Sequence, residues 1–145
     1  MARLKLDFPE PAIYSTDIQV RVDDINYGGH VGNDRFLTII HEARLRLFRD
    51  LGYKDEGSIL DQAGIIVTDA ALVYKSEIFL GDKIRIEISI ADRNKYGFDF
   101  FYRINNLSNN KISAIIKTGV VSFDYSRSKV IQFPEEFFER LRNLE

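Results

Sequence analysis

The sequence predicts an α+β fold in which an antiparallel sheet wraps around one long helix. A single segment, residues 33–53, has the apolar periodicity of a long amphipathic helix. About four later segments have the alternation or the β-branched composition of strands. No helix pattern interrupts these segments, which favours antiparallel strands in meander order. One helix and one sheet must then bury their apolar surfaces against each other.

The first element is a predicted strand at residues 13–24. Ile18, Val20 and Val22 alternate there with polar residues. A period of two indicates a strand with one buried face. A polar, glycine-bearing loop, DDINYGGHVGND at residues 23–34, leads from this strand into the helix.

The predicted helix at residues 33–53 has an apolar face that recurs every three or four residues. This face consists of Phe36, Ile40, Ala43, Leu47 and Leu51, widened by Leu37 and Phe48. Asn33 or Asp34 can cap the start of the helix. Gly52 can end it in the left-handed conformation.

The remaining strands are predicted at residues 64–79, 83–93, 95–106 and 111–125. In the second of these, isoleucines alternate with charged or polar residues, at Ile84, Ile86, Ile88 and Ile90. Leu80-Gly81-Asp82 separates two of the strands, and Ser108-Asn109-Asn110 forms a predicted turn. Pro134 begins a short predicted helix at the end of the chain.

The composition indicates one domain spanning residues 1–145. Hydrophobic residues make up 45% and charged residues 29% of the chain, as in ordinary globular proteins. The net charge of −2 argues against a nucleic-acid partner. Because the chain has no cysteine and only two histidines, no metal site is predicted. The apolar runs fall short of the roughly 20 residues that cross a bilayer, so we expect a cytoplasmic protein without a membrane partner.

Two segments carry a family resemblance. Residues 20–48, VRVDDINYGGHVGNDRFLTIIHEARLRLF, resemble the opening of hotdog-fold acyl-CoA thioesterases of the 4-hydroxybenzoyl-CoA thioesterase type. Residues 73–90, VYKSEIFLGDKIRIEISI, resemble the strand–Gly-Asp–strand hairpin of that family. The resemblance covers residues 14–125. It implies a hotdog fold, an acyl-CoA substrate that supplies coenzyme A without any separate cofactor, and homodimers or homotetramers with active sites between two subunits.

The sequence departs from the family pattern at one important position. In many members the second acid of an Asp-x-Asp motif is the catalytic carboxylate, and the matching residue here is Asn26. An amide can act neither as a general base nor as a carboxylate nucleophile. His30 does match the histidine of the GHVNN pattern in related thioesterases, whereas Gly28 stands where the plant-type pattern has asparagine.

Three residues of the loop are therefore catalytic candidates. Asn26 can orient water or donate to the substrate carbonyl. His30 can shuttle a proton near neutral pH, or it can be structural. Asp24 would share the face of Asn26 on a continuing strand and could supply the missing base. The alternative for Asp24 is a structural carboxylate that accepts backbone N–H groups and holds the loop.

The substrate-binding candidates are Gly29, Val31, Asn33 and Asp69. The loop at the helix start is predicted to present backbone N–H groups, from Gly29 through about Asn33, to a carbonyl that becomes an oxyanion. The alternative is a glycine-rich turn that only changes the chain direction. Asp69 is an acid within a strand-like run, so it either faces a polar pocket across the dimer or lies on an exposed face.

The leading functional hypothesis is an acyl-CoA thioesterase. A non-catalytic acyl-CoA-binding protein is the main alternative, because the family acid is absent at Asn26. A hotdog hydratase is a further alternative, since DINYGGH loosely matches an Asp-x-Asn-Pro-x-His motif but has one extra residue and no proline.

Overall fold

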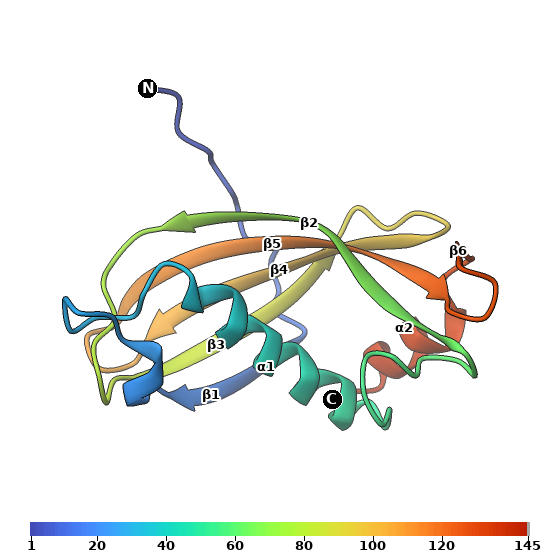
Figure 1. Cartoon of the computed structure of the whole chain (residues 1–145), viewed down its shortest axis with the longest axis horizontal. Helices are drawn as coiled ribbons and strands as arrows, with labels where there is room; N and C mark the ends of the chain where they lie inside the picture. Colours follow the sequence, from blue (N-terminus) through green and yellow to red (C-terminus); the bar gives the residue numbers. More distant parts are fainter. Residues whose placement is uncertain (145) are drawn as a thin grey trace.

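The computed structural model describes residues 1–144 and confirms the predicted architecture (Figure 1). One long helix, α1 (Arg35–Asp50), lies against a six-stranded antiparallel sheet. The strands are β1 (Tyr14–Gln19), β2 (Ala63–Tyr74), β3 (Lys83–Ala91), β4 (Gly97–Asn106), β5 (Lys111–Asp124) and β6 (Lys129–Val130). A 3₁₀ turn, η1 (Val22–Asp24), precedes α1, and a short helix, α2 (Glu135–Arg142), ends the described chain.

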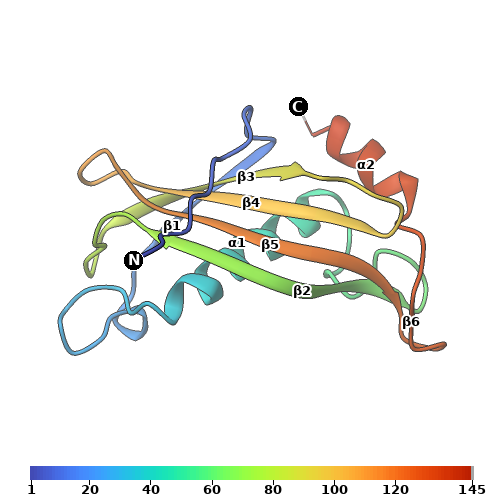
Figure 2. The ribbon, with the colours of Figure 1, turned by 90° about the horizontal axis from the view of Figure 1, so that it is seen from above.

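The strand order in the sheet is β1-β3-β4-β5-β2, with the short β6 paired to β5. The long strands run side by side and α1 crosses one face of them (Figure 2). The consecutive strands β3, β4 and β5 therefore lie in the middle of the sheet. β1 and β2, which come before and after the helix in the chain, form its two edges.

The alternating isoleucines of β3 explain how the sheet faces the helix. Ile84, Ile86 and Ile88 are fully buried, as their period of two predicts. Ile86 pairs with Thr16 of β1 on one side and with Ile104 of β4 on the other. The charged residues between the isoleucines lie on the opposite face of the sheet.

The apolar face of α1 is largely the predicted one, because its predicted residues are buried with the exception of Leu37. The prediction for Leu37 was wrong, since 42% of it is exposed. The reason is the position of the helix. Arg46 donates hydrogen bonds to Thr16 and Asp17 of β1, so one side of α1 lies over that edge. Leu37 lies nine residues before Arg46, on the opposite side of the helix by the period of 3.6 residues, and so projects away from β1.

The two ends of α1 differ in how they are capped. Asp34 occupies the N-cap position, but its side chain makes no capping hydrogen bond. At the other end Gly52 has a φ of 93°, and the N–H of Tyr53 reaches back to the carbonyl of Phe48 at 3.0 Å. The prediction for Gly52 is thus confirmed.

The first strand is shorter than predicted. Ile18 and Val20 are buried as expected, but β1 ends at Gln19 and Val22 is 69% exposed. The N–H of Asp24 donates to the carbonyl of Arg21 at 2.9 Å, which closes the 3₁₀ turn η1. This turn ends the alternation that the sequence pattern had extended to residue 23.

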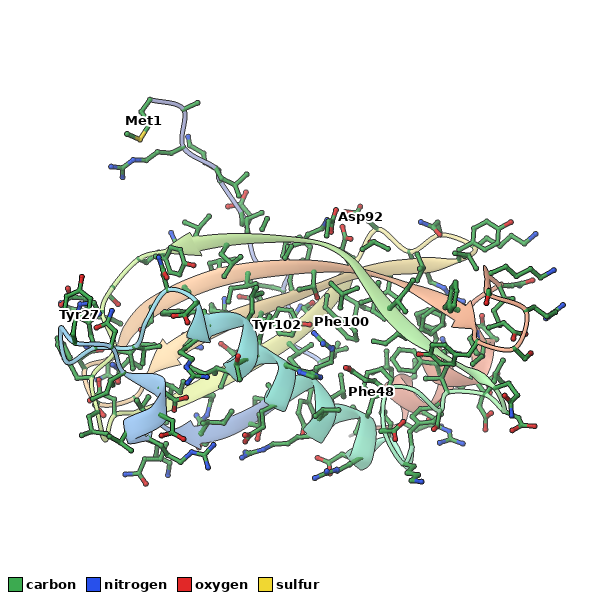
Figure 3. All side chains as sticks on the ribbon, viewed as in Figure 1. Met1, Tyr27, Phe48, Asp92, Phe100 and Tyr102 are labelled. Atoms are coloured by element: carbon green, nitrogen blue, oxygen red, sulfur yellow. The ribbon has the colours of Figure 1, made fainter. Side chains whose placement is uncertain are left out.

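Aromatic side chains fill the space between α1 and the sheet, where Phe48, Phe100 and Tyr102 lie close to one another (Figure 3). The cluster continues into α2, whose Phe137 packs on Phe48 with ring centroids 5.4 Å apart. Pro134 stands directly before α2, within one residue of its predicted place. Within residues 1–144, no helix is both long enough and apolar enough to cross a membrane.

Candidate active site at the start of the long helix

The polar loop before α1 begins with a tight turn. The side-chain Oδ1 of Asn26 accepts the N–H of Gly28 at 2.9 Å, and the N–H of Gly29 donates to the carbonyl of Asn26 at 3.0 Å. Gly29 has a φ of 81°, which favours glycine over other residues. The turn therefore fixes the orientation of the Asn26 amide: its Oδ1 is used within the loop, and its Nδ2 remains as a donor.

Two further hydrogen bonds fasten the loop to the body of the protein. The N–H of Val31 donates to the carbonyl of Ile78 at 2.8 Å, and the N–H of Gly32 donates to the carbonyl of Asp24 at 3.1 Å. Asp24 is buried, and its carboxylate accepts the N–H of Arg21 at 3.0 Å. This arrangement matches the structural alternative for Asp24, a carboxylate that holds the loop.

A pocket of about 560 Å³ opens beside this loop. It lies between the start of α1 and the segment that follows β2, close to the exposed Tyr27 at one end of the molecule (Figure 3). Its lining residues are Asn26, Tyr27, His30, Val31, Asn33, Phe36, Tyr74, Lys75, Ser76, Glu77 and Ile78. Of the predicted site residues, the pocket brings together Asn26, His30, Val31 and Asn33.

Asn26 and His30 face each other across Gly28. A Cβ atom at Gly28 would lie 3.0 Å from Nε2 of His30 and 3.3 Å from Oδ1 of Asn26. The other ring nitrogen of His30, Nδ1, lies 3.4 Å from the carbonyl oxygen of Val31. Because a carbonyl only accepts, this contact favours the tautomer with the proton on Nδ1, which leaves Nε2 as a proton acceptor.

The structure narrows the predicted set of carbonyl-binding N–H groups. Three of the five, those of Gly29, Val31 and Gly32, already donate to backbone carbonyls. Gly29 also does not line the pocket. For the N–H groups of His30 and Asn33, no acceptor is found anywhere in residues 1–144. Only these two N–H groups of the predicted stretch are free to bind a ligand.

The sequence reasoning missed the wall formed by residues 74–78. Tyr74 donates its hydroxyl proton to the carbonyl of Asn33 at 2.9 Å, and its ring meets Phe36 edge-to-face at a centroid distance of 5.1 Å. Glu77 is the one carboxylate among the residues that line the pocket. The abrupt change from an apolar run to Tyr-Lys-Ser-Glu at the end of a strand was the available signal.

Asp69 lies elsewhere, on the sheet face that points away from α1. Its carboxylate accepts hydrogen bonds from Nζ of Lys117 at 2.8 and 3.0 Å, and from the N–H of Gly119 at 2.9 Å. These bonds lower the pKa of Asp69 below its ordinary value. Within one protomer Asp69 is thus an exposed, ion-paired residue and does not line the pocket.

Four basic residues of the C-terminal half are paired with acids. Arg85, Arg93, Lys117 and Arg127 each form an ion pair. Lys75 lines the pocket, and no carboxylate within residues 1–144 forms an ion pair with it. In the same described part of the chain, no group of three histidine or acidic side chains is arranged to hold a metal ion.

Comparison with protein families gives a match over most of the chain. The model of the thioesterase-like superfamily matches residues 20–141. The chain belongs to the thioesterase-like superfamily. This membership confirms the family resemblance in the sequence and supports a thioester hydrolase. No curated protein gives a significant sequence match.

Solved structures of hotdog-fold thioesterases share the fold. The chain is similar to a 1,4-dihydroxy-2-naphthoyl-CoA thioesterase from Synechocystis, at 18% identity and a TM-score of 0.81 over 90% of this chain and 96% of the other. A DHNA-CoA thioesterase from Staphylococcus aureus is 20% identical to this chain, with a TM-score of 0.76 over 90% of this chain and 91% of the other. A Staphylococcus aureus protein in complex with CoA is 14% identical to this chain, with a TM-score of 0.77 over 97% of this chain and 87% of the other. The predicted hotdog fold is thereby confirmed.

Proposed function

We propose that this superfamily member is an acyl-CoA thioesterase, which converts an acyl-CoA and water into a carboxylic acid and CoA. One observation carries the proposal: a proton acceptor, a side-chain amide donor and free backbone N–H groups line a single pocket at the start of α1. They come from His30, Asn26 and Asn33. Hydrolysis of a thioester requires donors for the carbonyl oxygen, a base or nucleophile, and a groove for the acyl chain and the CoA arm.

The donors are assigned to the oxygen of the thioester carbonyl. That oxygen becomes negative when water attacks, and N–H groups at a helix start stabilise negative charge through direct bonds and through the helix dipole. The free N–H groups of His30 and Asn33 supply two donors, and Nδ2 of Asn26 supplies a third. The amide of Asn26 then acts as a hydrogen-bond donor at the position where the family pattern has a catalytic base.

His30 is assigned to proton transfer. Nε2 accepts a proton from the attacking water as the new C–O bond forms. The same proton then goes to the sulfur as the C–S bond breaks, and CoA leaves as the thiol. Because Nδ1 is directed at the carbonyl of Val31, the imidazolium formed in between is hydrogen-bonded on that side.

The two parts of the substrate have different surroundings. Val31, Phe36 and Ile78 give the pocket an apolar wall for the acyl group. Lys75 is the cation assigned to the CoA phosphates, because it lines the pocket without a carboxylate partner of its own. CoA enters as part of the substrate and not as a cofactor.

The proposal includes a homodimer that forms along β2. This edge strand has one charged residue in twelve, Asp69, and so lacks the charges that usually protect an edge. Val67 pairs with the core residue Val120 and thus faces the side of α1, yet it is 46% exposed. A second copy paired antiparallel to β2 would cover this surface and would leave no long exposed edge there.

The first experiment incubates the protein with acetyl-, palmitoyl-, benzoyl- and 4-hydroxybenzoyl-CoA and follows free thiol with a trapping dye. Release of CoA by the parent protein, strongly reduced in a His30→Ala variant, is the expected result. Tight binding of CoA esters without release of thiol would identify a binding protein and refute the hydrolase.

The second experiment tests the dimer by sedimentation. We expect twice the chain mass for the parent and for Ser15→Lys, which adds a charge to the opposite edge strand β1, but a shift to monomer for Val67→Lys. A monomeric parent at micromolar concentration would refute the dimer.

A further inference from the structure

Tyr74 makes a contact that the proposed chemistry leaves unexplained. It lies at the end of the edge strand β2 and is 50% exposed. Its hydroxyl nevertheless donates to the carbonyl of Asn33, across the pocket and next to the first turn of α1. The sequence separation of 41 residues shows that the bond joins two distant parts of the chain.

Asn33 depends on this bond to an unusual degree. Its N–H is one of the two free donors of the loop, and its side chain points to no partner. Within residues 1–144, the bond from Tyr74 is the one hydrogen bond in which any atom of Asn33 takes part. Its neighbours are held better: Gly32 donates to Asp24, and Arg35 donates to Gly32 at 2.9 Å.

We propose that Tyr74 is a positioning residue, whose hydroxyl holds Asn33 so that the N–H of Asn33 stays directed at the substrate carbonyl. This inference rests on the proposed thioesterase function. A donor stabilises an oxyanion only when it is already aimed at the oxygen, because reorientation during the reaction would cost part of the gain. The ring of Tyr74 packs edge-to-face on Phe36, so the hydroxyl itself is held in place.

The position of Tyr74 also connects the site to the sheet. β2 pairs with β5 from Ala63 to Tyr74, with one irregularity between Val67 and Asp69. The bond from Tyr74 thereby ties Asn33 to the sheet, in addition to the bonds that hold its own loop. A shift of the end of β2 would move the donor.

The test compares Tyr74→Phe with Tyr125→Phe. Both substitutions remove a hydroxyl from a half-exposed tyrosine, since Tyr125 is 47% exposed. Tyr125 does not line the pocket, and its hydroxyl, unlike that of Tyr74, makes no hydrogen bond within residues 1–144. The acyl-CoA of the panel above that the parent hydrolyses with the highest kcat/KM is the substrate. For Tyr74→Phe we expect kcat to fall about fivefold, or about 1 kcal/mol at 1.36 kcal/mol per decade, with KM and the melting temperature unchanged. Tyr125→Phe should match the parent.

A second measurement does not depend on turnover. The amide ¹⁵N shift of Asp34 responds to hydrogen bonding at the preceding carbonyl, that of Asn33, so Tyr74→Phe should move the Asp34 signal and Tyr125→Phe should not. An unchanged Asp34 signal, or a kcat within twofold of the parent, would overturn the positioning role. Failure of the parent to hydrolyse any ester would instead refute the thioesterase, and the Asp34 signal would then decide the contact by itself.

Discussion

Replacing Asn26 by aspartate is the sharpest test of the proposed chemistry. The substitution is nearly isosteric and restores the carboxylate that the family pattern contains at this position. If residue 26 served as a base, the variant would gain activity. If residue 26 serves as a hydrogen-bond donor, the variant loses the donor and places a negative charge where the oxyanion forms.

The structure allows the size of the effect to be worked out. The Oδ1 of Asn26 accepts the N–H of Gly28 at 2.9 Å, and an aspartate would keep that bond. The second carboxylate oxygen would then replace Nδ2. Loss of one donor costs about 10²- to 10³-fold in kcat. Two like charges about 4 Å apart, at an effective dielectric constant of about 20, repel by about 4 kcal/mol, which adds a further factor of about 10³ as an upper limit.

We therefore expect the order of kcat to be parent, then Asn26→Ala, then Asn26→Asp. The kcat of the alanine variant should fall about 10²-fold, at the lower end of that range, because the N–H groups of His30 and Asn33 remain. The aspartate variant should fall at least 10³-fold at pH 7.5 in the thiol-release assay. Its melting temperature should stay near that of the parent, because Asn26 is exposed and the turn is preserved.

Asn109→Asp provides a matched control. Oδ1 of Asn109 accepts the N–H of Lys111 at 3.0 Å, two residues ahead, as Asn26 does with Gly28. The control changes the net charge equally and lies in the turn between β4 and β5, so its kcat should equal that of the parent. If an Asn26→Asp variant hydrolysed acyl-CoA as fast as the parent, or faster, the donor role of Asn26 would be refuted. A carboxylate at residue 26 would then be identified as a catalytic base.

The remaining predictions concern four other side chains. His30→Ala should lower kcat by about 10²- to 10⁴-fold, whereas Glu77→Gln should leave it within about threefold if His30 is the base. Asp24→Ala should lower the free energy of unfolding in urea by about 0.5–2 kcal/mol, because a buried carboxylate that caps backbone N–H is lost. Lys117 holds the pKa of Asp69 below its ordinary value of 3.8. Asp69 therefore stabilises the fold above that pH, and the difference in melting temperature between parent and Asp69→Asn should vanish in acid.

Each of these predictions can be contradicted by a specific result. Equal losses in Glu77→Gln and His30→Ala would indicate that the carboxylate shares the proton transfer. An Asp24→Ala variant that is as stable as the parent but inactive would show that Asp24 is a catalytic residue and not a structural one. A melting-temperature difference at Asp69 that persists unchanged in acid would show that the ion pair does not control it.

Periodicity predicted the elements that bury one face. The isoleucines of β3 and the apolar face of α1 follow directly from periods of 2.0 and 3.6 residues, and Gly52 from the need for a positive φ. Leu37 could not be predicted in the same way. Its exposure depends on which half of the sheet the helix covers, and that is a property of the packed molecule and not of the helix pattern.

The site was predictable as a loop but not as a set of free donors. The concentration of polar residues and glycines before a helix indicated the loop, the family resemblance pointed to Asn26 and His30 within it, and the pocket brings both together. Which backbone N–H groups are free depends on carbonyls far away in the chain, such as that of Ile78. The wall at residues 74–78 was missed for the same reason, since only the fold places it beside the loop.

The place of the pocket in the sheet links the proposed catalysis to the proposed dimer. Arg46 ties α1 to β1, and on the other edge strand, β2, the helix-facing Val67 is 46% exposed. The pocket lies between the start of α1 and the end of β2, whose last residue, the half-exposed Tyr74, lines it. Hydrogen bonds to an oxyanion are worth most where water is excluded, since a low dielectric strengthens them. A second copy along β2 would cover the exposed surface next to the donors of Asn26, His30 and Asn33, so the same contact that protects the sheet edge would strengthen each donor at the start of the helix.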